Sequence, residues 1–588
     1  MSWMINLGLG LILFYAVALP WQISYNMLPV PTYTNEFVAI SGWGLLLLVV
    51  ARARIKRFQY SAALQYLVAF YSLLLLTVIV QSVSGFGAIL SVSALWIFFL
   101  GVAGACAYAG YTIAASPDLN RFADLFAAAW VLGGLLSVGA QLVQYLGLDV
   151  SWYVVAPLSE PGRAYGNIRQ PNHLVTLLGI AMVCVVWLQA RGKVQRFTTA
   201  LLTLMLGLGI LLSGSRTGLV ILFGLFVWTL IRLPRGMERR LIWTAPVCAA
   251  VILYLLFSLD SLGVLPYSGR EQIMASLEGV SDPRASGMRF EIWRNSLELI
   301  RANWLMGTGF GQFQFYYLLS DLPQPSKTLF TNAHSLPVQV AVEFGIPITV
   351  VLFCLLARAG WAARHVFKST LGQCCAAAVA VVAVHSMLEF PLWYAYFLLP
   401  TSFFLGVLAG LPTGTEQPSV LVGAGAERSK VLAWAGMLTM ALLITAVPHY
   451  MSLAAIYAPG GNKDSLAARL ETAQKGFIYR HWILFTVLAA YPIAQSEKIA
   501  LLADLYDSNA RFFMNDEYLL RYAIVLALTG RLDEAKRVAS ALKSLDSDAV
   551  LRLKSYCESH PNPELKALAT YIDNPGPTAV SAAGFRVR

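Results

Sequence analysis

Charged residues are scarce in this sequence. Asp, Glu, Lys and Arg make up 12% of its 588 residues, whereas a soluble domain averages about 25%. This deficit excludes a water-soluble globule. Instead the chain contains many apolar runs of roughly 17–25 residues, the length that crosses the hydrocarbon core of a bilayer. The composition therefore predicts an all-α polytopic membrane protein.

Cysteine is also rare, with seven residues. Six cysteines lie in or beside apolar runs: Cys106, Cys184, Cys248, Cys354, Cys374 and Cys375. The seventh, Cys557, has no obvious partner. No CxxC and no Cys/His metal spacing occurs. We therefore expect neither a disulfide framework nor a zinc site.

The apolar runs predict about thirteen membrane-spanning helices. The first stretch follows no Lys or Arg, since the first basic residue is Arg52, and no small-residue cleavage site comes after it. We expect a retained span there and not a signal peptide. The helices are expected near residues 5–20, 36–51, 61–82, 88–112, 122–146, 173–190, 197–213, 217–232, 241–258, 336–357, 371–388, 392–410 and 431–449.

The basic residues gather in alternate loops. These loops are residues 51–57, 191–196, 232–240, 358–368 and 427–430. By the positive-inside rule they face the cytoplasm together with the N-terminus, and the sparse loops face outward. The net charge of +11 is thereby explained without a nucleic-acid partner. An odd number of spans places the chain after about residue 450 outside.

Four segments follow from this topology: N-terminal transmembrane helices (1–258), a large periplasmic loop (259–335), C-terminal transmembrane helices (336–449) and a periplasmic α-helical domain (450–588). In the last segment, residues 522–545 carry apolar side chains at helical spacing around a Thr-Gly-Arg turn. The core "LALTG-x-x-DEA" resembles one tetratricopeptide-like helix pair, with no clear second copy.

Arginine is uncommon in the outward loops. Arg216 lies in "LLSGSRTGLVILF", between two spans, where a guanidinium is costly unless it faces a polar cavity or a partner. Arg289, Trp293 and Leu297 share one face of a helix expected within residues 281–300. Any single arginine here is also compatible with lipid headgroup contact or simple solvation. Several arginines without lysines favour bidentate recognition of phosphate.

A third polar cluster lies in "PGRAYGNIRQPNHLVTLLGIA" (161–181), at the expected start of a span. Pro171 is a plausible first helical residue and Gln170 lies in the cap region. The density of polar groups favours binding of a sugar or a phosphate; the alternative is an ordinary loop that caps a span. No outward Asp cluster resembles a DxD motif, so we expect a metal-independent site. The cluster comprises Arg163, Asn167, Arg169, Gln170, Asn172 and His173.

Two histidines occupy outward positions. His334 lies in "TNAHSLP", after Asn332, and His385 begins "HSMLEFPLWYAYFLLP". With an unperturbed pKa of about 6.5, a neutral imidazole is the usual group to remove a hydroxyl proton at neutral pH. A hydrogen-bonded structural role is equally compatible with either histidine alone. Glu389, four residues after His385, could hydrogen-bond it within a helical turn.

Two nearby features are not expected to take part directly. Glu343 follows His334 by nine residues, which places it two or more turns inside the membrane, too far for a direct pair. The glycine-rich "GTGFGQF" (307–313) lacks the GxGxxG spacing and a strand–helix context, so we expect a turn and not a nucleotide loop.

The order of these motifs resembles a superfamily of bacterial O-antigen ligases, Wzy-type polymerases and PglL-type O-oligosaccharyltransferases. The resemblance lies in "SGSRTG" (213–218), "MRFEIWRNSLELIRANWLMGTGFGQF" (288–313) and "NAHSLPVQVAVEFGIP" (332–347). "GNIRQPNHLVTLL" (166–178) and "HSMLEFPLWYAYFLLP" (385–400) are similar to the protein-glycosylating PglL branch. The resemblance covers residues 160–410, and the helical tail is similar to the C-terminal region of PglL-like enzymes.

The resemblance implies a GT-C-type glycosyltransferase in the bacterial inner membrane, with its active site facing the periplasm. It implies a donor oligosaccharide on undecaprenyl pyrophosphate and no cofactor, metal or nucleotide. Arg216 and Arg289 would hold the pyrophosphate, and His334 would be the catalytic histidine. The order "NAHS" differs from the "HN" order of many ligases, with Asn332 on the other side of the histidine. The other polar residues named above would support the site or contact the glycan and the acceptor.

The acceptor separates three related activities. Transfer to Ser or Thr of exported proteins such as pilin, ligation to lipid A–core, and polymerisation of repeat units would share one phosphate site. "RQPNHL", "HSMLEFPLWYAYF" and the outward tail favour a protein acceptor. A transporter would instead place charged residues at broken helices near the bilayer midplane, whereas the polar residues here gather at the outer mouth.

Overall fold

A computed structural model describes residues 2–53, 61–158, 163–232, 254, 283–320, 322, 329–412, 424–457, 464–493, 498–545 and 547–574. Within these ranges every regular element is a helix and no strand occurs. Seven of the described helices are long and apolar enough to cross a membrane, and others are apolar but shorter. The structure thus confirms an all-α, polytopic membrane protein.

The expected membrane helices match observed helices closely. The expected helix near residues 241–258 lies outside the described residues except for Tyr254, so the number of spans stays a prediction. The others correspond to α1 (Ser2–Val17), α2 (Tyr33–Val50), α3 (Ala62–Val83), α4 (Leu90–Ala114), α5 (Leu119–Tyr145), α6 (Pro171–Ala190), α7 (Arg196–Leu212), α8 (Arg216–Arg232), α13 (Leu336–Ala362), α14 (Thr370–Ser386), α15 (Ala395–Gly410) and α16 (Ala424–Tyr457).

The chain divides into two compact units. The first comprises Met1–Ser72, Phe99–Pro283 and Cys354–Thr445. The second comprises Leu73–Phe98, Arg284–Phe353 and Ala446–Arg588. Four long helices, α3, α4, α13 and α16, contribute residues to both units.

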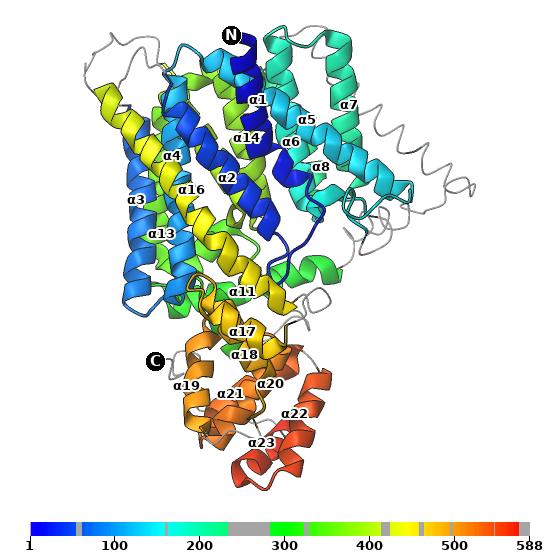
Figure 1. Ribbon diagram of the computed structural model, residues 1–588, viewed down its shortest axis with the longest axis vertical. Helices are drawn as coiled ribbons and strands as arrows, with labels where there is room; N and C mark the ends of the chain where they lie inside the picture. Colours follow the sequence, from blue (N-terminus) through cyan, green and yellow to red (C-terminus); the bar gives the residue numbers. More distant parts are fainter. Residues whose placement is uncertain are drawn as a thin grey trace. The chain divides into compact units, whose positions relative to one another are not determined.

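Helix α6 is the central helix of the first unit. It packs against α5, α7, α8 and α14, and Figure 1 shows α5 and α6 side by side. Every residue from His173 to Leu188 is buried. A helix that is apolar all round belongs in the middle of a bundle. The polar residues that precede α6 are therefore fixed to the most buried element of this unit.

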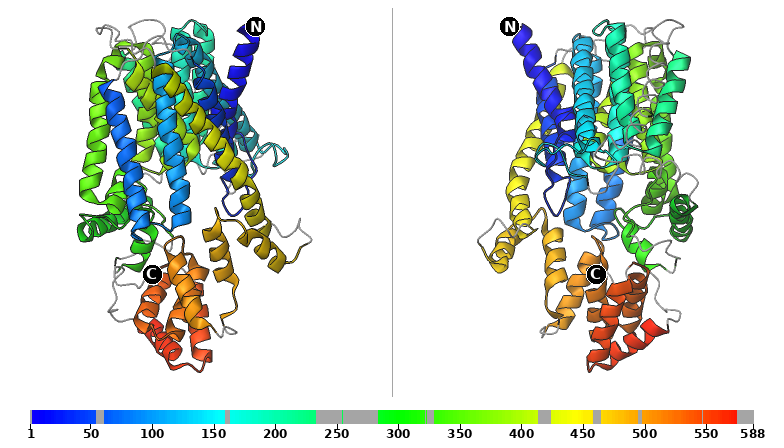
Figure 2. Two further views of the ribbon diagram at one scale, coloured as in Figure 1. Left: turned by 60° about the vertical axis from the view of Figure 1, so that its left-hand side comes forward. Right: turned by 90° about the vertical axis from the view of Figure 1, so that its right-hand side faces the viewer.

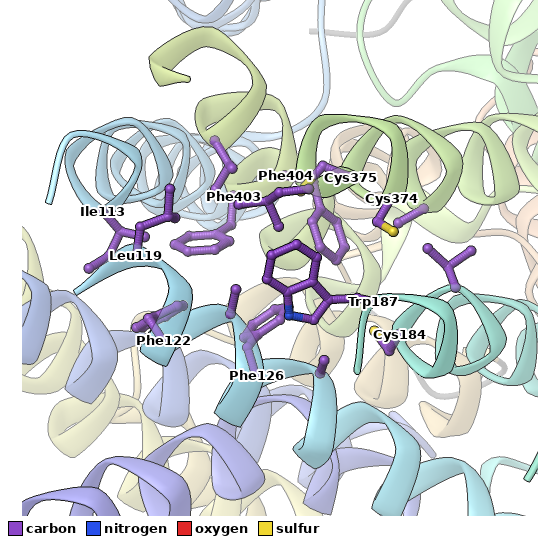
Figure 3. Close-up of a pocket in the computed structure, with 16 residues that line it drawn as sticks. Ile113, Leu119, Phe122, Phe126, Cys184, Trp187, Cys374, Cys375, Phe403 and Phe404 are labelled. Atoms are coloured by element: carbon purple, nitrogen blue, oxygen red, sulfur yellow. The ribbon is translucent and has the colours of Figure 1, made fainter. Parts of the chain in front are cut away.

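An apolar cavity lies towards the other end of α6. Figure 3 shows Trp187 and Cys184 of α6 facing aromatic residues of α5 and α15 and two cysteines of α14. All of the lining side chains are apolar, aromatic or thiol. Trp187 is fifteen residues beyond Asn172, about 22 Å along the helix. The cavity is thus separate from the polar start of α6 and offers no charged group to a phosphate.

The second unit contains the C-terminal helices, of which α20 to α23 each pack against the next (Figure 2). The helix pair expected around the Thr-Gly-Arg turn is confirmed, because α20 ends at Leu528 and α21 begins at Leu532. The helices are α17 (Leu466–Gln474), α18 (Arg480–Ala490), α19 (Ile499–Ala510), α20 (Asp516–Leu528), α21 (Leu532–Leu545), α22 (Ser547–Ser559) and α23 (Pro563–Asp573).

Two further helices, α11 (Pro283–Ala302) and α12 (Phe313–Leu319), lie in the part of the large loop that the structure describes. Helix α12 belongs to two hydrophobic cores. Phe315, Leu318 and Leu319 are part of the core formed by the C-terminal helices. Phe313 and Tyr317 join a second core that includes Ala333, directly before His334. One short helix therefore packs on both the tail and the histidine loop.

Glycine allows α4 and α15 to cross closely. A Cβ atom on Gly110 of α4 would lie 2.1 Å from the carbonyl oxygen of Phe403, which belongs to the backbone and cannot move aside cheaply. Gly101 lies on the same helix and has nothing within 4 Å of its Cβ position.

We expect Gly110→Val to destabilise the protein by at least about 1–3 kcal/mol, and Gly101→Val to change stability little. Thermal unfolding of the two purified variants in detergent checks this difference, and equal melting temperatures would contradict it.

Candidate functional site

The start of α6 is built as the sequence predicts. Pro171 is the first helical residue, and the side chain of Gln170 accepts a hydrogen bond from the backbone N–H of His173 at 2.6 Å. Arg169, just before the cap, has a left-handed backbone with φ of 58°. Left-handed backbone is uncommon for residues other than glycine, so the chain turns sharply before it enters the helix.

Two of the predicted site residues hold this turn together. The Asn167 amide donates to the carbonyl oxygens of Gln22 at 2.7 Å and Val154 at 2.8 Å. The Arg169 guanidinium donates to the carbonyl oxygen of Ser24, and its Nε atom is buried without a hydrogen-bond partner among the described residues. Burial lowers the pKa of Arg169. Because both Asn167 donors are used, we assign this side chain a structural role.

Asn172 joins two other segments. Its Nδ2 donates to Glu389 Oε1 at 3.3 Å, and its Oδ1 accepts a hydrogen bond from the hydroxyl of Ser215 at 2.5 Å. Ser215 directly precedes Arg216, the first residue of α8. Asn172 therefore connects the start of α6 to Glu389, beyond the end of α14, and to the turn from which Arg216 emerges.

Arg163 lies against the same turn. Its Nε donates to the carbonyl oxygen of Ser213 at 3.4 Å. The turn is short, because α7 ends at Leu212 and α8 begins at Arg216, as expected from the few polar residues between these spans. The first unit thus gathers Arg163, Asn172, Glu389 and the start of α8 around residues 213–215.

The two buried histidines of this unit lie close together. The rings of His173 and His385 are 5.6 Å apart between centroids. His173 Nδ1 is 3.2 Å from the hydroxyl of Tyr396, and His385 Nδ1 is 2.8 Å from the hydroxyl of Thr176. The His385 Nε2 atom is buried without a hydrogen-bond partner among the described residues. These contacts tie α6 to α14 and α15.

The expected hydrogen bond between His385 and Glu389 is not formed. The backbone does make a helical turn there, since Glu389 N–H donates to His385 O at 2.9 Å. Helix α14 ends at Ser386, however, and the Glu389 carboxylate contacts Asn172. Thr176, which lies inside an apolar run, is the partner that the sequence analysis missed.

In the second unit, His334 occupies a strained position two residues before α13. Its φ is 48°, in the left-handed region that a non-glycine residue seldom adopts. The backbone N–H of His334 donates to Asn332 Oδ1 at 3.0 Å, so the asparagine two residues earlier stabilises this conformation. Strained backbone of this kind concentrates at functional sites.

Helix α11 is attached to the same loop. The indole N–H of Trp293 donates to the carbonyl oxygen of Ala333 at 3.0 Å. Arg289 lies four residues earlier, and residues at this spacing share a helix face. Arg289 is therefore on the same face of α11 as Trp293. Leu297, expected on this face as well, is 51% exposed.

The glycine-rich stretch at 307–313 forms the expected turn and leads into α12. Glu343 accepts hydrogen bonds from Gln339 Nε2 and from the backbone N–H of Gly311. Gln339 and Ser215 were not among the site residues predicted from the sequence. A signal for Gln339 was available, because polar residues within membrane helices seldom occur without a function.

Three family profiles match the chain. The O-antigen ligase profile matches residues 200–354, and the profile for the C-terminal part of virulence factor membrane-bound polymerases matches residues 373–545. The protein glycosylation ligase profile matches residues 164–188. This last match covers the loop and the start of α6 that carry Asn167, Gln170, Asn172 and His173.

Two curated proteins of Acinetobacter baylyi are similar to the chain. A general O-oligosaccharyltransferase is 27% identical over 308 residues, which cover 51% of this chain and 53% of that protein. A ComP-specific O-oligosaccharyltransferase is 24% identical over 260 residues, which cover 42% of this chain and 44% of that protein. The chain thus spans about half the length of the curated relatives it matches.

Each profile covers part of the chain, and together they show that it is similar to O-antigen ligases and membrane-bound polymerases. The protein glycosylation ligase match and the two relatives add a similarity to protein-glycosylating O-oligosaccharyltransferases.

Asn172 offers a direct test of the polar connection at the start of α6. Replacing it by Leu leaves Ser215 and Glu389 without a hydrogen-bond partner that each has in the native protein, and an unpaired buried polar group costs about 1–3 kcal/mol. We expect Asn172→Leu to lower the stability by about 2–3 kcal/mol, and Ser215→Ala, which removes the hydroxyl that donates to Asn172 and accepts from Gly218 N–H, by about 1–2 kcal/mol. Thermal unfolding in detergent measures both. Equal and negligible effects would contradict a connecting role.

Proposed function

We propose that this protein transfers an oligosaccharide en bloc from undecaprenyl pyrophosphate to Ser or Thr hydroxyls of periplasmic proteins such as pilin. The observation that carries this proposal is the protein glycosylation ligase match, which falls on the polar start of α6. The names of both relatives describe O-oligosaccharyltransferases and support the same reaction.

In this proposal the arginines stabilise the leaving group. The acceptor oxygen attacks the anomeric carbon, the bond from that carbon to the phosphate oxygen breaks, and undecaprenyl pyrophosphate leaves with the electron pair. The developing negative charge requires fixed donors in a partly desolvated site. Arg216 and Arg289 would supply bidentate guanidinium contacts. Arg163 lies beside the turn that precedes Arg216 and would assist it.

His334 would act as the general base. A Ser or Thr hydroxyl is a poor nucleophile, and a neutral imidazole can accept its proton as the new glycosidic bond forms. The left-handed backbone of His334, held by Asn332, gives the imidazole a defined direction. Positively charged groups and an imidazole suffice for this chemistry, so we propose a reaction without a metal ion or other cofactor.

The membrane arrangement belongs to the same proposal. We propose about thirteen spans in a GT-C-type fold, placed in the bacterial inner membrane with the site facing the periplasm. Residues 259–335 would form the large periplasmic loop and residues 450–588 a periplasmic helical domain. The polyprenyl chain would lie among the membrane helices, so that only the pyrophosphate and the glycan reach the polar residues.

A second candidate shares the donor and differs in the acceptor. The O-antigen ligase and membrane-bound polymerase profiles both match long segments of the chain. Their descriptions favour transfer to lipid A–core or to a growing polysaccharide. The acceptor therefore has to be decided by experiment.

A cell that makes a lipid-linked glycan provides this test. It would express the protein together with a pilin-like acceptor and a complete lipid A–core. We expect glycosylated pilin and unmodified core, because the α6 start matches the protein-glycosylating profile. Intact-protein mass spectrometry measures the first and gel analysis of lipopolysaccharide the second. Modified core with unmodified pilin would overturn the protein acceptor in favour of ligation.

The role of His334 is tested by His334→Ala. We expect the variant to accumulate at the normal level in the membrane and to lose transfer by at least about 100-fold, the range that general base catalysis contributes. His560→Ala, in the C-terminal helices, is the matched control and should keep full activity. Transfer at the wild-type rate by His334→Ala would remove the histidine from the mechanism.

A further inference from the structure

A chain of buried hydrogen bonds runs from the glycine-rich turn to the histidine loop, within the second unit. The backbone N–H of Gly311 donates to Glu343 Oε1 at 3.0 Å, and Gln339 Nε2 donates to the same oxygen at 2.9 Å. The backbone N–H of Ala333 donates to Gln339 Oε1 at 2.7 Å. Ala333, Gln339 and Glu343 are exposed by 0%, 3% and 5%. The chain therefore ends at the residue before His334.

One end of this chain is fixed by a break in α13. Gly345 has non-helical φ and ψ of 78° and 167°, and a Cβ atom there would lie 2.6 Å from the carbonyl oxygen of Leu305. The break leaves carbonyl oxygens without helical partners. The N–H groups of Thr308 and Gly309 donate to the carbonyl oxygens of Val342 and Glu343, at 2.7 and 3.0 Å. The N–H groups of the turn and the carbonyl oxygens of the helix thereby pair with each other away from water.

The carboxyl group of Glu343 determines how the amide of Gln339 is oriented. Its Oε1 accepts from the backbone N–H of Gly311 as well as from Gln339 Nε2, so the amide points its NH2 group at Glu343. The amide oxygen is then left for the N–H of Ala333. Without an acceptor oxygen at position 343, the amide of Gln339 could rotate. Its NH2 group would then face the N–H of Ala333, and two hydrogen-bond donors would meet.

The peptide groups around His334 are held from three sides. Gln339 accepts from Ala333 N–H, Trp293 donates to Ala333 O, and Asn332 accepts from His334 N–H. Left-handed backbone at a non-glycine residue persists only where the surroundings determine it. The hydrogen-bond chain is thus one of the contacts that keep the imidazole in its direction.

We propose that Glu343 and Gln339 are positioning residues that fix the backbone of His334 for catalysis. The proposal rests on the proposed function, in which His334 is the base. Neither side chain would touch the substrate. The expected effect is on the rate of transfer, because misplacing a catalytic group by about 1 Å can cost about 100-fold in rate, while donor binding by the arginines is left intact.

The first test breaks the chain in the middle. Gln339→Met keeps the length of the side chain and removes both hydrogen bonds. We expect kcat to fall by about 10- to 100-fold, with the KM for the lipid-linked donor within about threefold of wild type. Gln373→Met, which replaces a half-buried glutamine in the first turn of α14, is the control and should change neither quantity.

The second test compares two changes of Glu343. In Glu343→Gln the amide oxygen can accept from both Gly311 N–H and Gln339 Nε2, as Glu343 Oε1 does in the native protein, so kcat should stay within about threefold of wild type. Glu343→Met removes this acceptor, and kcat should fall by about 10- to 100-fold, as in Gln339→Met. A merely space-filling role would give the two variants the same rate.

Trp293→Phe keeps the proposal testable if Gln339→Met fails to fold, because it removes only the donor to Ala333 O. We expect kcat to fall about 3- to 10-fold with an unchanged donor KM. Wild-type kcat in Gln339→Met, or equal rates in Glu343→Gln and Glu343→Met, would overturn the positioning role. His334→Ala, measured in parallel, separates the two proposals: an active His334→Ala refutes the proposed mechanism, whereas an inactive one with fully active Gln339→Met refutes only the positioning role.

Discussion

Every polar group of the backbone must find a partner inside the protein wherever water is excluded, and the second unit depends on this requirement. Helix α13 is broken at Gly345, within an apolar candidate span. The turn at residues 304–309 compensates for this break: the N–H of Ile346 donates to Trp304 O at 2.8 Å, and Thr308 and Gly309 donate to carbonyl oxygens of α13. Non-helical backbone at such depth is tolerated only where protein satisfies it. The histidine loop, Glu343 and α12 take their positions from this pairing.

In the first unit, the buried polar groups that need partners within the protein belong to side chains at the start of α6. Its central helix, α6, is buried almost throughout, and polar residues occur mainly at its start. Asn172, Thr176 and His173 each hydrogen-bond a residue of another helix or turn. Uncompensated polar groups in this environment would cost several kcal/mol each. The polar start of α6 is therefore a connected part of the fold, with the turn before Arg216 attached to it through Ser215.

The sequence predicts much of the fold because the bilayer limits the possibilities. Apolar runs locate the spans, Pro171 and Gln170 locate the start of α6, and the Thr-Gly-Arg turn separates α20 from α21. Contacts between distant residues are a different matter. Glu389 was expected to pair with His385 and pairs with Asn172, because side-chain direction at a helix end depends on what packs there. The connection from Gly311 to Ala333 also joins three segments, and no local pattern reveals it.

Helix α12 determines which parts of the second unit unfold together and which segment must accompany the C-terminal tail when it is grafted onto another protein. Its residues Phe315, Leu318 and Leu319 complete the core of the C-terminal helices, and Phe313 and Tyr317 complete the core beneath the histidine loop. Partial unfolding of either core uncovers a surface of the other, which makes tail and loop one cooperative unit in local unfolding. A boundary for grafting the tail onto another protein consequently has to include α12, although this helix lies more than a hundred residues before the tail in the chain.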